Sequence, residues 1–542
     1  MPRAHALTNA IRAISLGATL LTGVVDTVHA EGAVDPLTVQ TRSGLVRGVE
    51  DNGTVAFRGI PYAAAPIGAR RWALPEPAKP WEGVRDAKAY GTGCPQVARY
   101  GLTEAGYDED CLSINVTVPG ALKPGAPKKP VIAWVYGGAF VGGSSALYPL
   151  AAMAKAGDAV VVSFNYRLGV FGFMGHPAFG RDHDGGYGLE DQRLALRWIQ
   201  DNIAAFGGDP ANVTVAGESA GAASICMHLV APKETTGLFA KAIVQSAFCA
   251  QTLRAPAEAD KIGRTVAEDV GCTGDDALAC LRSKPVKELL EAAAKTAGND
   301  VMTYVPMMGT QTIPEQPRAA FSSGRFVQVP FINGGNRDEL RLYVAYDMQA
   351  GQTITPATYP ALIGHVYGDK AARVLAEYPA ANYSSAGAAL GTAMTDFTPV
   401  NGLNYCGFLE TARLASAHVS VFQYEFADRA APPPIAGTPP MEMGAVHSSE
   451  LPYQFPGFSN TTKLDSPPLA APSQALASTM MSFWTSFSAT SVPKAPNMPT
   501  WPRFRTPADT MRLEPGHVAL FDAGAEHHCG FWRELYPELL GG

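Results

Sequence analysis

The sequence lacks the features that bind nucleic acid or span a membrane. Its 42 Lys and Arg residues are outnumbered by 49 Asp and Glu residues, the formal net charge is -7, and no Lys/Arg-rich run occurs. Beyond the N-terminal region it has no uninterrupted apolar run of the roughly 18 or more residues that a membrane helix needs. We therefore expect neither a nucleic-acid partner nor integral membrane association.

A metal-binding pattern is missing as well. The nearest approach is His527-His528-Cys529, and no second Cys or His stands at ligand spacing around this segment. The sequence therefore predicts no bound metal and no cofactor.

The N-terminus has the three parts of a secretory signal peptide. Arg3 and Arg12 precede an apolar stretch over residues 13–25, and Val28-His29-Ala30 follows as a small-x-small cleavage pattern. We predict that residues 1–30 are removed after Ala30 and that the protein is secreted or periplasmic; a buried N-terminal helix is the alternative. The eight cysteines fit an oxidising compartment.

The body of the chain alternates predicted strands with predicted helices. Apolar runs bounded by turn residues predict buried strands at residues 130–135, 158–163, 212–216, 241–245 and 330–334. An amphipathic helix is predicted over residues 189–206, and residues 250–328 are predicted to be more helical. This alternation implies parallel pairing, so we expect an α/β protein with a mostly parallel central sheet flanked by helices, in one domain over residues 31–542.

The strongest local signal for chemistry is a G-x-S-x-G motif, Gly217-Glu218-Ser219-Ala220-Gly221. It follows a predicted strand and precedes helical-looking residues 222–229, which is the context of a nucleophile elbow. Small neighbours let the backbone turn sharply and leave the serine hydroxyl exposed at the helix N-terminus. The alternative is a glycine-flanked serine in an ordinary turn.

A second segment could supply donors for an oxyanion. Gly137-Gly138-Ala139 follows the predicted strand 130–135, and small side chains let backbone N–H groups approach a substrate. A plain glycine turn is the alternative.

The general base cannot be chosen from spacing alone. In this type of site the chain order is nucleophile, acid, histidine. The histidines beyond the candidate nucleophile are His228, His365, His418, His447, His517, His527 and His528.

At this point the sequence resembles the type-B carboxylesterase family over nearly all of the predicted mature chain. The likeness lies in multi-residue motifs at residues 57–63, 81–87, 109–115, 164–169, 188–192 and 202–210, which lead into the serine motif. The resemblance implies the α/β-hydrolase fold, with large helical and loop insertions around the site.

The resemblance also implies the remaining site residues. The family's acid occurs in an Asp-Glu pair after a strand, which implies Glu339 and leaves Asp338 as a neighbour without a role. Its histidine occurs in a Gly-x-x-His-x-x-Glu-Leu pattern, which residues 444–451 reproduce with His447. Arg341, close behind the acid, is expected to point to solvent.

The family's oxyanion hole implies the backbone N–H groups of Gly138, Ala139 and Ala220. Its disulfides imply the pairs Cys94 with Cys111, Cys272 with Cys280, and Cys406 with Cys529. Cys226 and Cys249 would then be free.

The function implied is that of a secreted serine carboxylesterase that cleaves a small-molecule ester through an acyl-enzyme, with Ser219, Glu339 and His447 as its triad. The chain resembles in particular bacterial members such as para-nitrobenzyl esterase and fumonisin esterase, so a bulky or polycarboxylate ester is a candidate substrate. Two alternatives stand beside this one: a noncatalytic cholinesterase-like binding or adhesion protein, and an interfacial lipase.

Overall fold

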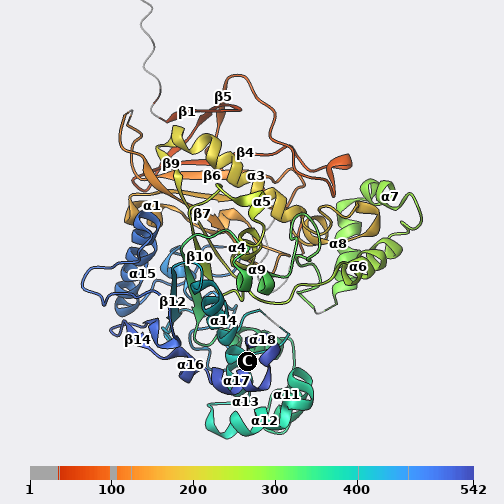
Figure 1. Ribbon diagram of the computed structural model, residues 1–542. Coiled ribbons are helices and arrows are strands. Elements are labelled where there is room, and N and C mark those ends of the chain that lie inside the picture. The colour runs from red at the N-terminus through yellow and green to blue at the C-terminus, as the bar shows by residue number, and fades with distance from the viewer. Residues whose placement is uncertain are drawn as a thin grey trace, which may run out of the picture. The chain divides into compact units, whose positions relative to one another are not determined.

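The computed structural model describes residues 35, 37–97, 106–123, 125–298, 300–400, 402–461 and 463–541. The predicted signal peptide, residues 1–30, lies outside the described residues. Pro36–Gly542 forms one compact unit (Figure 1). Within the described ranges, no helix is both long and apolar enough to cross a membrane.

Strands and helices alternate through the middle of the chain. The strands are β1 (Thr38–Thr41), β2 (Gly44–Arg47), β3 (Val49–Asp51), β4 (Thr54–Pro61), β5 (Val84–Asp86), β6 (Ser113–Val118), β7 (Lys129–Val135), β8 (Val160–Phe164), β9 (Gly208–Glu218), β10 (Lys241–Gln245), β11 (Phe331–Asn336), β12 (Val421–Phe426), β13 (Thr510–Leu513) and β14 (Ala519–Phe521). The helices up to β11 are α1 (Ala151–Gly157), α2 (Gly169–Phe173), α3 (Tyr187–Asn202), α4 (Ala220–Leu229), α5 (Pro232–Thr235), α6 (Pro256–Asp269), α7 (Ala277–Ser283), α8 (Val286–Ala297) and α9 (Pro317–Ser323). Those after it are α10 (Arg341–Gln349), α11 (Tyr359–Tyr367), α12 (Ala371–Glu377), α13 (Ala386–Asp396), α14 (Tyr405–Ser416), α15 (Ala471–Thr490), α16 (Ala523–Glu526), α17 (Cys529–Leu535) and α18 (Pro537–Leu540).

An 11-stranded sheet forms the centre, in the order β14-β13-β12-β11-β10-β9-β7-β8-β6-β4-β3. The strands from β13 to β8 in that order run parallel. The edges, β14 on one side and β6, β4 and β3 on the other, pair antiparallel. A small second sheet holds β1, β2 and β5.

Helices cover both faces of the central sheet. Trp484 of α15 donates to Gln245 of β10 at 2.6 Å, so α15 lies on the face to which Gln245 points. Asn333 of β11 donates to the carbonyl of Phe408 in α14 at 2.9 Å. Asn333 pairs in register with Val244, whose side chain points away from that of Gln245, so α14 lies on the opposite face.

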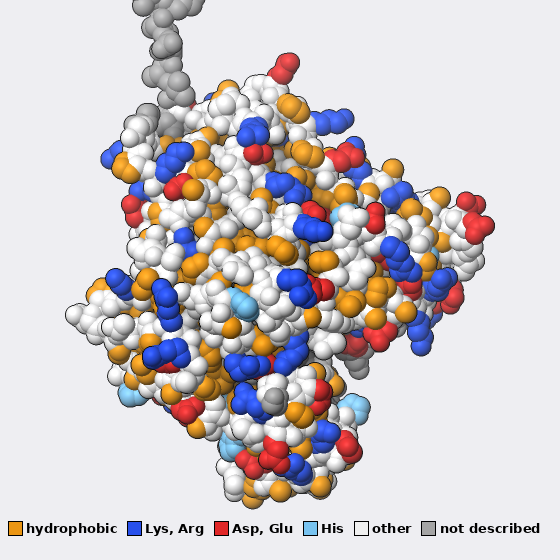
Figure 2. All heavy atoms as spheres, in the orientation of Figure 1, with side chains coloured by type: hydrophobic (Ala, Val, Ile, Leu, Met, Phe, Trp, Pro, Cys, Tyr) orange, Lys and Arg blue, Asp and Glu red, His pale blue; other side chains and the backbone are white. Residues whose placement is uncertain are grey.

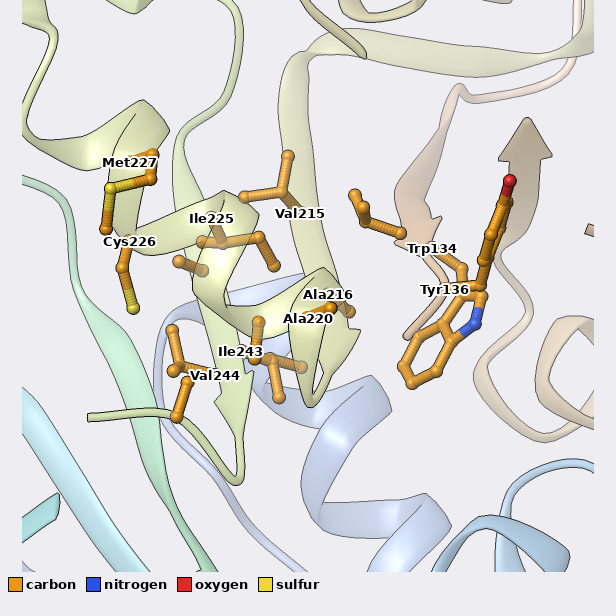
Figure 3. Packing of buried hydrophobic residues seen from close by; sticks show 14 of the residues in the cluster. Trp134, Tyr136, Val215, Ala216, Ala220, Ile225, Cys226, Met227, Ile243 and Val244 are labelled. Carbon is orange, nitrogen blue, oxygen red and sulfur yellow. The ribbon is translucent and has the colours of Figure 1, made fainter. Parts of the chain in front are cut away.

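The coverage explains the sequence pattern of the inner strands. All residues of β8 and β10 are buried, as parallel strands covered on both faces require. In Figure 3, side chains of α4 such as Ile225 lie among the apolar side chains of β9 and β10, including Val215 and Val244. The predicted strands correspond to β7, β8, β9, β10 and β11, and the predicted helix to α3 with the short 3₁₀ turn after it. The predicted α/β fold is confirmed.

Charged side chains of both signs share the surface. On the face drawn in Figure 2, Lys and Arg side chains are interspersed with Asp and Glu. This mixture agrees with the small net charge of the chain.

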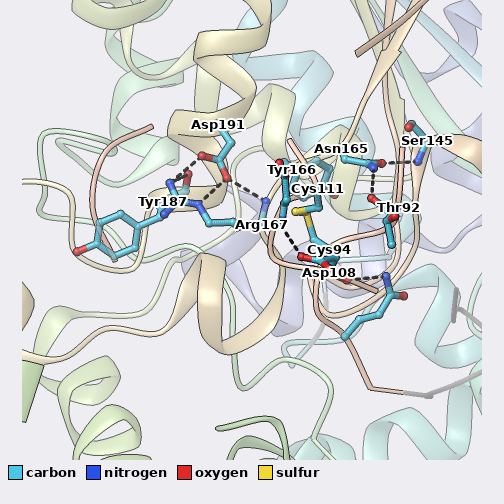
Figure 4. Close-up of a disulfide and its surroundings, with 12 residues drawn as sticks. Thr92, Cys94, Asp108, Cys111, Ser145, Asn165, Tyr166, Arg167, Tyr187 and Asp191 are labelled. Carbon is cyan, nitrogen blue, oxygen red and sulfur yellow. Dashed lines mark hydrogen bonds and ion pairs between the residues drawn. A yellow bond between two sulfur atoms is a disulfide. The ribbon is translucent and has the colours of Figure 1, made fainter. Parts of the chain in front are cut away.

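Four disulfides join the eight cysteines. Cys94 bonds to Cys111 (Figure 4), Cys272 to Cys280, and Cys406 to Cys529. The last pair is separated by 123 residues in sequence, and a loop of that length contributes about 4–5 kcal/mol in the chain-entropy model.

The expectation that Cys226 and Cys249 are free was wrong. Cys226 lies on α4 and Cys249 in the turn after β10, and the two are joined by a disulfide with a Cα–Cα distance of 5.0 Å. The cause is that α4 packs against β10, which brings two fully buried cysteines within bonding range. No free cysteine remains among the described residues.

This pairing predicts the result of thiol labelling. Denatured without reductant, residues 31–542 should carry no iodoacetamide adduct, and after reduction they should carry eight, one for each cysteine. Intact-mass measurement checks both states, and the reduced sample is the control for reagent access. Two adducts before reduction, mapped to Cys226 and Cys249, would show that this pair is open.

Candidate active site

The serine motif forms a strained turn between β9 and α4. Ser219 has φ 56° and ψ -126°, a conformation that is rare for a residue with a side chain. The turn also passes close to β7: a Cβ added to Gly221 would lie 2.0 Å from the carbonyl oxygen of Val135, and one added to Gly217 would lie 2.7 Å from the same atom. The two glycines of the motif are therefore required by close approach of the backbones.

The structure brings Ser219, His447 and Glu339 together in a hydrogen-bonded line. His447 Nε2 lies 2.9 Å from Ser219 Oγ, and His447 Nδ1 lies 2.7 Å from Glu339 Oε2. The other oxygen of Glu339 accepts a hydrogen bond from Ser246 Oγ at 2.5 Å and one from the Asn336 N–H at 2.7 Å. A serine hydroxyl, an imidazole and a fixed carboxylate in this order can transfer a proton away from the hydroxyl.

Three backbone N–H groups next to Ser219 are available to a ligand. They belong to Gly138, Ala139 and Ala220, and no described residue accepts a hydrogen bond from them. Gly138 has φ 117°, and a Cβ there would lie 2.2 Å from the carbonyl oxygen of Gly142, so the loop needs glycine at this position. Ala139 follows in the left-handed region with φ 52°. Ala220 is the first residue of α4, where N–H groups have no partner in the helix.

Two further buried carboxyl groups surround His447. Glu218 Oε1 lies 3.2 Å from His447 Nε2 and accepts a hydrogen bond from Ser448 Oγ at 2.7 Å. Glu450 accepts a hydrogen bond from Asn336 Nδ2 at 2.6 Å. Both residues stand in the motifs that pointed to Ser219 and His447. Their sequence positions carry no signal for a role, because only the fold brings them near the imidazole.

The carboxyl groups change the proton affinity of the site. Burial raises the pKa of Glu218, and burial together with the negative charge of Glu218 raises the pKa of Glu450 to about 8. For His447, burial lowers the pKa, but Glu218 and Glu339 together outweigh burial and raise the pKa to about 9. The imidazole therefore holds its proton more strongly than an exposed histidine does.

Asp338, the neighbour to which the sequence assigned no role, holds the histidine loop. Its N–H donates to the carbonyl of Ala445 at 2.9 Å, and its carboxylate accepts the Ala445 N–H at 3.0 Å. Two residues on, the His447 N–H donates to the carbonyl of Glu339 at 3.2 Å. The pair Asp338-Glu339 is thus connected through its backbone to the loop that carries His447.

Two arginines neutralise Asp338. Arg429 forms a bidentate pair with its carboxylate, at 3.0 Å and 2.9 Å. Arg341 was expected to point to solvent, and this was wrong: it is 5% exposed and lies 3.3 Å from Asp338. Arg341 turns inward because α10 packs against α13. There its Nη2 donates a hydrogen bond to Thr392 Oγ1 at 3.0 Å.

The histidine segment near the C-terminus has other partners. Both ring nitrogens of His527 lie 2.6 Å from carboxylates, those of Asp396 and Glu425, and His528 Nδ1 lies 2.6 Å from Glu377. Within the described ranges, no group of three or more His, Cys, Asp or Glu side chains is arranged to hold a metal ion.

Known proteins resemble this chain over most of its length. The protein-family sequence model described as "Carboxylesterase family" matches residues 35–532 of the chain. The chain is 33% identical to fumonisin B1 esterase of Sphingopyxis macrogoltabida, over 91% of this chain and 89% of that protein. It is 33% identical to para-nitrobenzyl esterase of Bacillus subtilis (strain 168), over 86% and 92%, and 32% identical to acylcarnitine hydrolase of Mus musculus, over 95% and 94%.

A change at Glu218 should move the pH dependence of any reaction that uses His447 as a base. The neutral imidazole is the active form, so kcat/KM should rise with pH as the proton is lost, toward a midpoint near 9. Glu218→Gln removes one negative neighbour, so the imidazolium is less stabilised and the midpoint should move to lower pH. Initial rates from pH 5 to 10 measure it, with Glu288→Gln at the surface as the control. An unmoved midpoint would mean that Glu218 does not act on the titrating group.

Loss of the Asp338 contacts should misplace the base. In Asp338→Ala the loop of residues 444–447 loses the acceptor of the Ala445 N–H, and Arg429 and Arg341 lose their charge partner. We expect kcat to fall about tenfold or more with KM changed less than about twofold. The exposed Asp369→Ala is the matched control. Equal kcat values in both variants would remove Asp338 from the positioning of His447.

Proposed function

The chain belongs to the carboxylesterase family and is a carboxylic ester hydrolase, and we propose that it forms its acyl-enzyme on Ser219. In this proposal His447 is the general base and Glu339 fixes and stabilises the imidazole. The observation that carries it is the unbroken line from Ser219 Oγ through His447 to Glu339, at 2.9 Å and 2.7 Å.

Acylation begins when His447 Nε2 takes the proton of the Ser219 hydroxyl. The oxygen attacks the ester carbonyl, a C–O bond forms, and the carbonyl electron pair moves to the oxygen. The N–H groups of Gly138, Ala139 and Ala220 would bind that oxyanion. The intermediate then collapses: the bond to the alcohol oxygen breaks, and His447 gives its proton to the leaving alcohol.

Deacylation repeats these steps with water. His447 takes a proton from a water molecule, the hydroxide attacks the acyl carbon, and the bond to Ser219 breaks as the proton returns to its oxygen. The carboxylic acid is released. No step in this sequence requires a metal ion.

Export is the second part of the proposal. Residues 1–30 would be the signal peptide, and residues 31–542 the mature single-domain enzyme. Four disulfides support an oxidising compartment, because such bonds persist outside the cytosol.

For the substrate, we favour a bulky uncharged ester over a polycarboxylate one. One relative is named for fumonisin B1, which is why a polycarboxylate ester is a candidate substrate. A polycarboxylate acyl group would need cations beside the nucleophile. The described residues that line the inner cavity at Ser219 include no Lys or Arg, and most of them are apolar. A polyanionic group would find no cation to pair with there.

Ser219→Ala tests the mechanism directly. Residues 31–542 should hydrolyse para-nitrophenyl acetate and butyrate, and the variant should lose at least about a thousandfold in kcat/KM. The exposed Ser323→Ala should keep full activity. A fluorophosphonate should add its mass to Ser219 and to no other residue.

Two outcomes would contradict the mechanism. Activity retained in Ser219→Ala would move the nucleophile elsewhere, and a folded protein that is silent on neutral and polyanionic esters alike would favour the noncatalytic binding reading.

A further inference from the structure

Ser219 lies between two cavities that differ in size and in lining. One, the histidine cleft, measures about 20 Å³ and is lined by residues that include His447, Glu218 and Tyr148. The other, the inner chamber, measures about 50 Å³ and is lined by residues that include Ala220 and Phe248. Among the described residues, His447 lines the histidine cleft and not the inner chamber.

The inner chamber shares part of its lining with a much larger space. An outer chamber of about 530 Å³ adjoins it, and the two share a ring of lining residues, here called the collar: Phe140, Ala223, Phe248, Gln251, Met302 and Gly402. The histidine cleft shares Ala139, Ser219 and Tyr343 with the inner chamber, and among the described residues it shares none with the outer chamber. The outer chamber therefore adjoins the cavity that His447 does not line.

The outer chamber is suited to an uncharged apolar group. Its walls include the buried side chains of Met227 and Leu253 and the partly buried Val305. Its charged lining residues among those described are Arg254 and Glu258, one of each sign. The Arg254 guanidinium donates to the carbonyl of Met302 at 2.9 Å and to that of Thr303, and these contacts fix the wall of the chamber.

The proton transfers of the proposed mechanism decide which part of an ester enters which cavity. His447 must give its proton to the leaving alcohol, so the alcohol oxygen has to lie beside Nε2, on the side of the histidine cleft. The carbonyl oxygen points to the N–H groups of Gly138, Ala139 and Ala220. The remaining substituent of the carbonyl carbon, the acyl chain, then points into the inner chamber.

We propose that the inner and outer chambers together form the acyl-binding site, and that the enzyme prefers esters of a long or bulky uncharged monocarboxylic acid with a small alcohol. This inference rests on the proposed function and specifies its substrate class. A short acyl group fills only the inner chamber, whereas a longer one passes the collar and buries its chain in the outer chamber. Each methylene buried there should raise kcat/KM by about fourfold at most.

Two isomeric esters separate acyl size from alcohol size. Methyl octanoate and heptyl acetate have the same formula and nearly the same hydrophobicity, but they place the long chain on opposite sides of the carbonyl. Measured by acid release at constant pH and below the solubility limit, kcat/KM for methyl octanoate should exceed that for heptyl acetate by about tenfold or more. Equal values, or a preference for heptyl acetate, would overturn the assignment of the chambers.

Val305→Trp locates the preference in the outer chamber. Val305 lines the outer chamber and not the inner one, so a larger side chain there should shorten the space for long chains only. We expect kcat/KM for methyl octanoate to fall about tenfold while that for methyl acetate stays within about twofold. The matched control is Val492→Trp, at a residue that is 36% exposed and follows α15. Equal losses on both esters, or no loss on either, would overturn the proposal.

Failure here is distinguishable from failure of the proposed function. If methyl acetate is hydrolysed and Ser219→Ala abolishes this activity, the mechanism stands, and the isomer ratio alone judges the acyl site. If neither wild-type protein nor any variant hydrolyses an ester, the proposed function has failed and this inference falls with it.

Discussion

The site depends on the close approach of two backbones, the end of β7 and the turn between β9 and α4. A Cβ on Gly137 would lie 2.8 Å from the carbonyl oxygen of Glu218, and one on Gly221 would lie 2.0 Å from that of Val135. This contact sets the position of Ser219 and, at the same time, that of the loop whose N–H groups face it. Because β7 and β9 are neighbours at the centre of a buried parallel sheet, neither partner can shift alone without breaking the register of the other.

The second constraint is electrostatic. Glu218 and Glu339 lie against one buried imidazole, and the charge of Glu450 acts on it as well; carboxylates this close together disfavour each other's ionisation. The raised pKa of Glu450 and the raised pKa of His447 are two expressions of this crowding, since the protons are shared among groups that cannot all be charged. In the proposed reaction, a site of this kind stabilises the imidazolium that forms.

How much could be read from the sequence depended on whether a feature was local. The elbow, the strand before it and the helix after it lie within a few residues, so the motif predicted the turn at Ser219, which the structure forms. The fold class followed from strand and helix periodicity. His447 and Glu339 came from the family resemblance, because 108 residues separate them in sequence and no spacing rule joins them. Three features could not be predicted in this way: the Cys226–Cys249 bond, the inward Arg341 and the contacts of Asp338. They depend on how elements distant in the sequence pack together, which the periodicity of the sequence does not show.

The groups proposed to react and the residues proposed to select the substrate lie in different parts of this molecule. The groups proposed to react stand at the ends of β9 and β11 or, like His447, are bonded to the segment after β11, so they inherit the rigidity of the sheet. The outer chamber is walled instead by segments between the sheet elements, residues 251–255, 302–306, 397–400 and 402, which contribute no group to the proton transfers. A change in these segments alters the volume offered to the acyl chain and leaves the line from Ser219 to Glu339 intact. Substrate preference can therefore diverge between relatives that share about a third of their residues while the hydrolytic step remains the same.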